Sequence, residues 1–207
     1  MTRLRLERAK HDLGEGAWVA LFEEFMPDHA SLMERLRATL PLKQESIRLA
    51  GKDVLTPRLV SWHGDSEARY AYSGRTFEPA PWTPELLMVK ERVDAAAGAS
   101  FNSVLVNYYR DGRDSVGEHA DDEPELGPEP GNVLIASVSL GARRRFLLRH
   151  KRSRVVEEFE LGDGGLLVMG GTTQRHFTHR APRTTADVGP RMNLTFRVVV
   201  RPSSLRS

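Results

Sequence analysis

The stretch PRMNLTFR, residues 190–197, decides the fold expected of this chain, because its polar and apolar side chains alternate. In an extended strand, alternate side chains point to opposite faces. The apolar ones pack on one side, and the other side carries Arg191, Asn193, Thr195 and Arg197. Two arginines on one inward face need anions. A salt-bridged strand would supply them, but a dicarboxylate ligand explains the pair better, since each guanidinium grips one carboxylate through paired hydrogen bonds.

Short β-rich runs lie between residue 101 and this strand. They are separated by Gly, Pro and Asp turns, and they read SVLVNYYR, NVLIASVSL, RRFLLR, VVEEF and GLLVMG. Several short strands at this spacing predict a β-sandwich or jelly roll. Asn107 and Tyr109 alternate within VLVNYYR. They therefore share a face, and we expect them to add donors to the pocket of the two arginines.

The first hundred residues mix helix and extended chain. Residues 29–40 place leucines at helical spacing. A second helix is predicted to begin after Thr83, a good cap, with Pro84 at its first position, and to end at Gly98. Between the two helices, residues 56–74 alternate aromatic residues with turn formers, which indicates strands and a hairpin.

Composition limits the classes of protein to consider. The 207 residues suffice for one domain with a sizeable core and fall short of two. No apolar run approaches the roughly 20 residues that span a bilayer, and the first residues lack the apolar centre of a signal peptide. We therefore expect a soluble protein without membrane attachment. Cysteine is absent, which excludes disulfides and thiolate metal ligands, so any metal must bind histidine and carboxylate groups.

Basic residues cluster although the formal net charge is only +2. The longest cluster is RRRFLLRHKRSR, residues 143–154, and others lie near both ends of the chain. Such clusters permit phosphate binding. A run of this kind is nevertheless more often a solvated face, so it does not by itself indicate a nucleic-acid partner.

A candidate metal site begins in GEHADDEPELG, residues 117–127. In a strand, His119 and Asp121 would point to the same side. A later strand offers either His176 or His179 as a third ligand, and spacing does not choose between them; His63 and His150 also remain candidates. Two imidazoles and one carboxylate form the facial set of non-haem Fe(II) oxygenases. Ordinary surface or core histidines are the alternative.

These segments together resemble the AlkB family of Fe(II)- and 2-oxoglutarate-dependent dioxygenases. The likeness covers residues 56–200, and its parts stand in family order, from PRL and YAYSG through FNSVLVNYYRDG, GEHADDEPELG and IASVSLGARRRF to GLLVMGGTTQRHFTHRAP and PRMNLTFR. It implies a mainly β (α+β) fold: a double-stranded β-helix, or jelly roll, with N-terminal helices and a nucleotide-recognition lid. It also implies one domain over 1–207, with an N-terminal extension and lid over about 1–100 and a catalytic core over about 101–200.

The resemblance assigns ligands residue by residue. It selects His179, rather than His176, as the third iron ligand beside His119 and Asp121. It implies that Arg191 holds the distal carboxylate of 2-oxoglutarate together with Tyr109. The remaining residues implied to bind this co-substrate are Asn107, Asn193, Thr195 and Arg197, with Asn107 and Arg197 near the carboxylate at the metal.

The resemblance also implies a reaction and a substrate. Fe(II), 2-oxoglutarate and O2 would oxidise N-methyl groups of bases such as 1-methyladenine and 3-methylcytosine in DNA, releasing formaldehyde as a form of direct repair. Such bases are cationic, and a base must leave the duplex to be reached. Residues that match lesion-contacting positions are Tyr70, Tyr72, Asp122 and Glu123.

Two other functions remain open at this point. One is an RNA or protein demethylase on the same scaffold, and the other is a non-catalytic nucleic-acid-binding module. A binding module needs no such ligand set, which favours the enzyme. We expect an intracellular monomer, cytoplasmic in a bacterium and nuclear in a eukaryote.

Family members that act on duplex DNA carry a wedge side chain, and its position aligns with Leu49–Gly51. Ala50 is too small to replace a flipped base in the duplex. We therefore expect that alkylated single strands are preferred.

Overall fold

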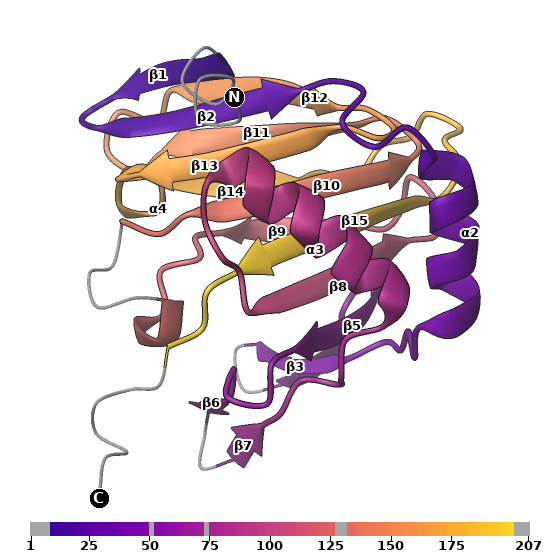
Figure 1. The fold of residues 1–207 in the computed structure, drawn as a ribbon. Coiled ribbons are helices and arrows are strands. Elements are labelled where there is room, and N and C mark those ends of the chain that lie inside the picture. Colours follow the sequence, from indigo (N-terminus) through magenta and orange to yellow (C-terminus); the bar gives the residue numbers. More distant parts are fainter. Residues whose placement is uncertain (1–8, 50–51, 73–74, 127–131, 201–207) are drawn as a thin grey trace, which may run out of the picture.

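The computed structural model describes residues 9–49, 52–72, 75–126 and 132–200, and within these it leaves the side chains of 47–49, 52–53, 70–72 and 75–77 undescribed. Two antiparallel sheets form its centre (Figure 1). The larger sheet has the order β1 (Lys10–Gly14), β2 (Ala17–Phe22), β13 (Leu166–Gly171), β10 (Ile135–Gly141), β15 (Arg191–Arg197), β8 (Ser103–Tyr109) and β5 (Leu59–Gly64). The smaller has the order β12 (Val156–Leu161), β11 (Arg144–His150), β14 (Phe177–Ala181) and β9 (Val116–His119).

Two hydrophobic cores separate three layers. One lies between the sheets, where Phe146 and Leu148 of β11 cluster with Ile135 and Leu167 of the larger sheet. The other lies between the larger sheet and two helices, α2 (His29–Thr39) and α3 (Pro84–Ala97) (Figure 1). Because the larger sheet is covered on both faces, its central strands are buried at nearly every position.

Strand β15 shows the predicted alternation. Its apolar residues Met192, Leu194 and Phe196 belong to the core under the helices. Its polar residues face the space between the sheets, where they line a pocket; these are Arg191, Asn193, Thr195 and Arg197. The prediction from PRMNLTFR is thus confirmed in both its strand and its division of faces.

The two predicted helices are also confirmed. Helix α3 begins after Thr83, whose Oγ1 accepts a hydrogen bond from the Leu86 backbone N–H at 3.3 Å. It ends at Gly98, which has the left-handed φ of +66° that glycine adopts without steric cost. Helix α2 ends at Thr39, one residue before the predicted end. No helix of the described residues is long and apolar enough to cross a membrane.

The N-terminal hairpin β1–β2 was not predicted. Strand β2 has the sequence AWVALF and pairs with β13, so both of its faces are covered and it lacks the alternation that marks a half-buried strand. Strand β5 joins the other edge of the same sheet. The larger sheet therefore draws strands from both sides of residue 100, and the division of the chain into extension and core stays a prediction. Two small hairpins complete the fold: β3 (Ser46–Leu49) with β4 (Lys52–Leu55), and β6 (Tyr70–Tyr72) with β7 (Arg75–Phe77).

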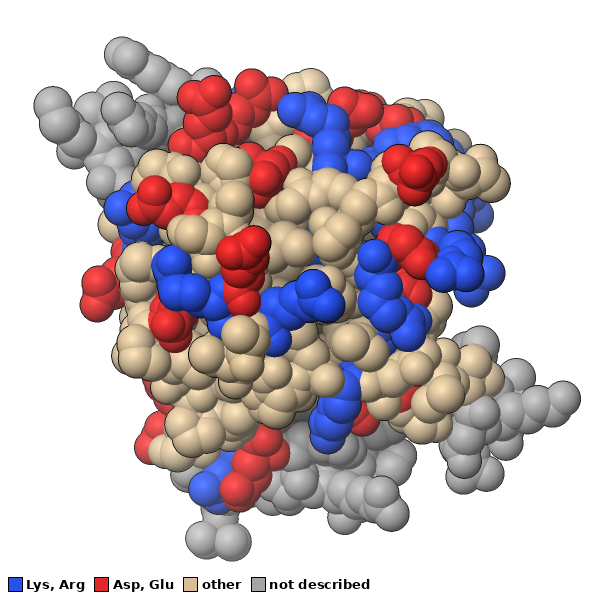
Figure 2. Space-filling model, turned by 90° about the vertical axis from the view of Figure 1, so that its right-hand side faces the viewer, with Lys and Arg blue, Asp and Glu red and all other residues tan. Residues whose placement is uncertain are grey.

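The basic cluster at 143–154 does not form an open phosphate-binding strip. Arg144 is 5% exposed. Several neighbours are ion-paired within the protein: Arg143 with Glu160, Arg145 with Glu158, Lys151 with Asp122 and Arg152 with Glu15. Figure 2 likewise shows Lys and Arg interspersed with Asp and Glu on the face that it presents. Arg144 in particular is buried and is not part of an exposed basic surface.

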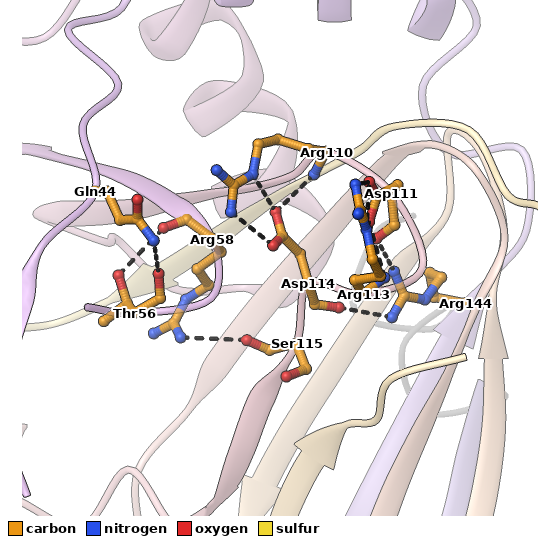
Figure 3. Close-up of polar contacts among 9 residues, drawn as sticks. All are labelled: Gln44, Thr56, Arg58, Arg110, Asp111, Arg113, Asp114, Ser115 and Arg144. Atoms are coloured by element: carbon orange, nitrogen blue, oxygen red, sulfur yellow. Dashed lines mark hydrogen bonds and ion pairs between the residues drawn. The ribbon is translucent and has the colours of Figure 1, made fainter. Parts of the chain in front are cut away.

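Arg144 instead holds the loop that leads into β9 (Figure 3). Its guanidinium donates to the backbone carbonyls of Asp111, Asp114 and Pro182 at 2.7–3.1 Å. The Asp114 carboxylate is bound in turn by both the side chain and the backbone N–H of Arg110. These contacts fix the chain just before His119, so Arg144 acts on the site through the backbone.

We expect Arg144→Met to destabilise the protein by about 3 kcal/mol, because it leaves buried carbonyls without donors. The matched control is Arg145→Met, which removes an exposed ion pair and is expected to cost less than about 1 kcal/mol. Urea unfolding of the two variants measures the difference. Equal losses of stability would contradict the bracing role of Arg144.

Candidate active site

Three potential metal ligands converge between the ends of β9 and β14. The pairing of these strands places His179 directly opposite His119, with ring centroids 4.3 Å apart. Asp121 completes the group: its Oδ1 lies 3.9 Å from His119 Nε2, and its Oδ2 lies 3.8 Å from His179 Nε2. Strand pairing thus brings together residues that stand 60 positions apart in the chain.

Asp121 reaches the group in a different way from the one predicted. Strand β9 ends at His119, so Asp121 lies in the following loop rather than on the strand. The run Asp-Asp-Glu-Pro disfavours an extended ladder, because these residues are depleted in strands and proline lacks a backbone donor. A buried hydrogen bond of 3.0 Å from the Asp121 backbone N–H to Gln174 Oε1 holds the loop in place.

The structure separates the candidate histidines. A short helix, α4 (Thr173–His176), interrupts the second histidine segment, so His176 lies at a helix end while His179 lies in β14. His176 faces Glu15 on the N-terminal hairpin, 3.3 Å away. His63 is buried elsewhere, between Ser61 and the carbonyl of Pro81. Of the alternatives left open by spacing, His179 is the one beside His119 and Asp121.

The protonation states of the group suit a cation. Burial alone would raise the pKa of Asp121, but neighbouring positive charge, first that of Arg197, outweighs it and the pKa is lowered. Burial lowers the pKa of His179 to about 3. His119 has its Nδ1 2.9 Å from the Gly117 carbonyl, and donation there leaves its Nε2 lone pair facing Asp121. The charged carboxylate of Asp121 and the neutral imidazole of His179 are the forms that coordinate metals.

One buried oxygen atom indicates that a metal ion fits at this place. Asp121 Oδ2 has no hydrogen-bond partner, although Asp121 is only 2% exposed. An unpaired buried carboxylate oxygen is costly and needs an explanation. A metal ion between the two imidazoles and this oxygen would provide one, so the residues present fit the implied group.

A polar pocket adjoins the three ligands. Antiparallel pairing of β15 with β8 sets Arg191 opposite Tyr109 and Asn193 opposite Asn107. All six residues predicted to bind the co-substrate line this pocket together with the metal candidates: Asn107, Tyr109, Arg191, Asn193, Thr195 and Arg197. The register of one strand pair therefore assembles most of its polar wall.

The two arginines of β15 differ in their partners. Arg191 is 2% exposed, donates to Ser139 Oγ at 2.8 Å and lies over the Tyr109 ring, yet no carboxylate of the described residues pairs with it. Burial lowers its pKa. Arg197 donates to Asp121 Oδ1 at 2.6 Å. Arg197 thus has an anion inside the protein, whereas Arg191 has none among the described residues, and the binding of a ligand carboxylate by either arginine stays a prediction.

The other predicted pocket residues are hydrogen-bonded to one another. Thr195 Oγ1 donates to Asn193 Oδ1 at 2.9 Å, and Asn193 Nδ2 donates to Ser137 Oγ at 2.7 Å. This chain fixes the orientation of the Asn193 amide. Direct contact of Asn193 and Thr195 with a co-substrate stays a prediction.

The sequence analysis missed a third arginine in the pocket. Arg58 Nε donates to Asn107 Oδ1 at 2.6 Å, and its Nη1 lies 3.5 Å from the Ser115 carbonyl (Figure 3). Burial lowers the pKa of Arg58. In the sequence it lies in the PRL segment of the family resemblance, which gave it no role, and its position depends on the pairing of β5 with β8. Gln174 was missed for the same reason, since its role depends on α4.

The predicted substrate residues lie at the rim of the site or outside the described side chains. Asp122 forms an ion pair with Lys151 at 3.2 Å, and its contact with a lesion stays a prediction. Glu123 is exposed in surface area, although partial desolvation and the nearby Asp121 raise the pKa of its carboxyl group. The backbones of Tyr70 and Tyr72 lie in β6, but their side chains are outside the described residues, as are Ala50 and Gly51 of the predicted wedge.

Comparison with known proteins gives the same ligand set a family context. A model of the 2OG-Fe(II) oxygenase superfamily matches residues 19–197. DNA oxidative demethylase ALKBH2 of Mus musculus is 43% identical over 162 residues, covering 74% of this chain and 66% of that protein. Alpha-ketoglutarate-dependent dioxygenase alkB homolog 3 of Bos taurus is 43% identical over 182 residues, covering 82% and 61%. The chain thus spans slightly less than two thirds of the length of these curated relatives.

A solved structure confirms the fold. The structure of OsALKBH1 matches with a TM-score of 0.62 and 20% sequence identity, covering 90% of this chain and all of that one. At this identity the likeness concerns the fold alone, and it agrees with the predicted jelly roll. The family model and the curated relatives together show that this chain belongs to the 2OG-Fe(II) oxygenase superfamily and, within it, to the AlkB family.

Proposed function

We propose that this protein is an Fe(II)- and 2-oxoglutarate-dependent demethylase that removes alkyl groups from DNA bases. One observation carries the proposal: a His-Asp-His group, with Asp121 and His179 buried, lies in one pocket with a buried arginine that no described carboxylate neutralises. Relatives at 43% identity carry the names DNA oxidative demethylase and alpha-ketoglutarate-dependent dioxygenase, which supports this reaction class. An enzyme that acts on DNA works inside the cell, and its compartment remains open.

In this proposal His119, Asp121 and His179 hold the ferrous ion. Bound Fe(II) supplies the activation of O2, with 2-oxoglutarate as the reductant that is converted to succinate and carbon dioxide. The protein orients the ligands. Gln174 positions the Asp121 loop through its backbone, and Arg197 keeps the Asp121 carboxylate ionised. The carbonyl of Gly117 holds the proton of His119 on Nδ1, which leaves Nε2 for the metal.

The co-substrate carboxylates are assigned by charge. The distal carboxylate of 2-oxoglutarate pairs with Arg191 and with the Tyr109 hydroxyl, where a buried guanidinium has no other anion. The carboxylate next to the metal lies near Asn107 and Arg197. Arg58 orients Asn107 by binding its amide oxygen, which leaves the amide N–H groups to donate. Asn193 and Thr195 form the polar wall between these positions.

The proposed substrate is a base carrying an N-methyl group, such as 1-methyladenine or 3-methylcytosine. One oxygen atom of O2 enters the methyl C–H bond and the other enters succinate. The resulting N-hydroxymethyl group loses formaldehyde, and the nitrogen recovers its unmethylated state. Glu123, at the rim and near the negative charge of Asp121, favours a cationic base over a neutral one. Tyr70 and Tyr72 are proposed to contact the flipped base together with Asp122 and Glu123.

An RNA or protein demethylase on the same scaffold is the alternative substrate class, and the names of the relatives favour DNA. A non-catalytic binding module is disfavoured because it needs no group of two histidines and one carboxylate beside a buried arginine, the arrangement that lines this pocket. We propose that the protein acts as a monomer.

The first prediction from this proposal concerns the iron ligands. His119→Ala, Asp121→Ala and His179→Ala are each expected to abolish formaldehyde release and to weaken Fe(II) binding, because each removes one of only three protein ligands. His176→Ala is the matched control and should retain iron at the site, since it faces Glu15 instead. Iron stoichiometry measured under anaerobic conditions in a Glu15→Gln background tests this, because that background leaves His176 without its carboxylate partner. Loss of iron in His176→Ala with retention in His179→Ala would overturn the assignment.

A second prediction concerns Arg191. Arg191→Ala should weaken 2-oxoglutarate binding about 100-fold or more, the equivalent of removing one partner from a buried ion pair. Arg191→Lys should restore binding only partly, because an ammonium group lacks the planar fork. Calorimetry with the Mn(II)-loaded protein measures binding apart from turnover. In contrast, Arg197→Ala should also weaken metal binding, since Arg197 holds Asp121. Unchanged 2-oxoglutarate affinity in Arg191→Ala would remove the basis for the site.

A third prediction tests the substrate. Formaldehyde release should be faster with methylated single-stranded DNA than with the same lesion in a duplex, because Ala50 cannot fill the space of a flipped base. Ala50→Phe should improve duplex repair. Rates on matched single-stranded DNA, duplex DNA and RNA decide the question. Faster duplex repair by the unmodified protein, lost in Leu49→Ala, would identify Leu49 as the wedge and refute the single-strand preference; faster reaction with RNA would favour the alternative substrate.

A further inference from the structure

A second group of two histidines and one carboxylate lies outside the candidate active site. It joins Glu15, in the turn between β1 and β2, to His150 at the end of β11 and His176 at the end of α4. His150 Nε2 lies 2.9 Å and His176 Nδ1 lies 3.3 Å from the same oxygen, Glu15 Oε2. The three potential ligand atoms lie within 4.8 Å of one another.

The two oxygens of Glu15 have different surroundings. Oε1 is bound by the Arg152 guanidinium, whereas Oε2 faces both imidazoles. The rings of His150 and His176 are nearly parallel, with an interplanar angle of 9° and centroids 6.2 Å apart. A carboxylate held through one oxygen and directed with the other toward two imidazole nitrogens is a pre-oriented monodentate ligand.

The backbone at Glu15 is unusual for a glutamate. Gly14, Glu15 and Gly16 all have left-handed conformations, with φ of +82°, +53° and +79°. A side chain in this region costs conformational energy that glycine avoids, and such residues concentrate at functional sites. Thr172 fixes the turn by donating through Oγ1 to the Glu15 carbonyl and through its backbone N–H to the Gly16 carbonyl. The fold thus accepts strain at the residue whose carboxylate meets the two histidines.

The far nitrogen of His150 also has a suitable partner. Its Nδ1 lies 3.0 Å from the Ser153 backbone nitrogen and 2.9 Å from Ser153 Oγ. When Nδ1 accepts from the backbone N–H, Nε2 carries the proton and donates to Glu15. With a metal on Nε2, the proton moves to Nδ1 and is donated to Ser153 Oγ, as is usual for metal-bound histidines. The contact with the backbone N–H is then lost.

We propose that Glu15, His150 and His176 form a second metal site, for a late divalent transition-metal ion such as Zn²⁺. Two imidazoles and a carboxylate are donors of the type that Zn²⁺ accepts, with water completing the coordination. The Glu15 side chain is 42% exposed, which gives the ion access from solvent. Because hydrogen bonds already hold the three ligands together, the fold does not depend on the metal. Because Arg152 repels a cation, the bound ion exchanges with ions in solution. The site is independent of the proposed demethylation.

Zinc stoichiometry of the metal-free full-length chain tests the proposal. Equilibrium dialysis should show two equivalents of Zn²⁺ for the unmodified protein and one for Glu15→Gln or His176→Gln. His29→Gln is the matched control: His29 Nδ1 lies 2.8 Å from Asp163 Oδ2 in another half-exposed pair, and its loss should leave both equivalents. Melting temperatures without metal show whether a variant is folded, and the two variants give independent tests of the site.

The His119→Ala/His179→Ala double variant isolates the second site. It should bind one equivalent of Zn²⁺ and melt at a higher temperature when Zn²⁺ is added, since binding to the native state stabilises it. Adding Glu15→Gln should remove both effects, and adding Ser153→Ala should weaken binding about 10- to 100-fold. No zinc binding by the double variant, or binding unaffected by Glu15→Gln and His176→Gln, would overturn the proposal. If the active site did not bind metal, the result would be different: the unmodified protein would bind one equivalent of Zn²⁺, and the double variant would still bind it.

Discussion

The rest of the structure depends on the burial of β15 on both faces. Its pairing with β8 and β10 leaves no solvent side, so its apolar residues pack under the helices and its polar residues must lie between the sheets. Buried polar groups are tolerated only when they are bonded or await a ligand. The hydrogen bonds of Asn193 and Thr195 meet the first condition. Arg191 has a hydrogen bond to Ser139 but no anionic partner among the described residues, which is why we propose it as the position that binds a ligand carboxylate.

Charge within the pocket follows from this constraint. Arg58, Arg191 and Arg197 line it with one buried carboxylate, Asp121. Because the low dielectric strengthens both attraction and repulsion, Arg197 lowers the pKa of Asp121 while burial lowers the pKa of the other two arginines. An excess of positive charge next to a metal site favours a dianionic ligand. We propose that this charge balance contributes to the selection of the co-substrate.

The short helix α4 directs two nearby histidines to different places. Four residues are enough to turn the chain, so His176 and His179 enter different clusters although only two residues separate them. The same helix carries Gln174, which holds the Asp121 backbone. Thr172, the residue before the helix, holds the hairpin of Glu15. One small element thus connects the active-site loop with the N-terminal hairpin.

The sequence alone determined the strand of residues 191–197, the division of its two faces and the limits of α3, because period-two alternation and helix caps are local signals. It did not reveal β2, whose two covered faces remove the alternation, or the place of Arg144, whose three acceptors come from distant backbone. Spacing left His176 and His179 equivalent, and the separation came from α4 and the pairing of β14 with β9. Contacts such as Arg58 with Asn107, or Glu15 with the two histidines, depend on sheet register and hairpin docking, which bring together residues whose distance along the chain carries no information about their distance in space.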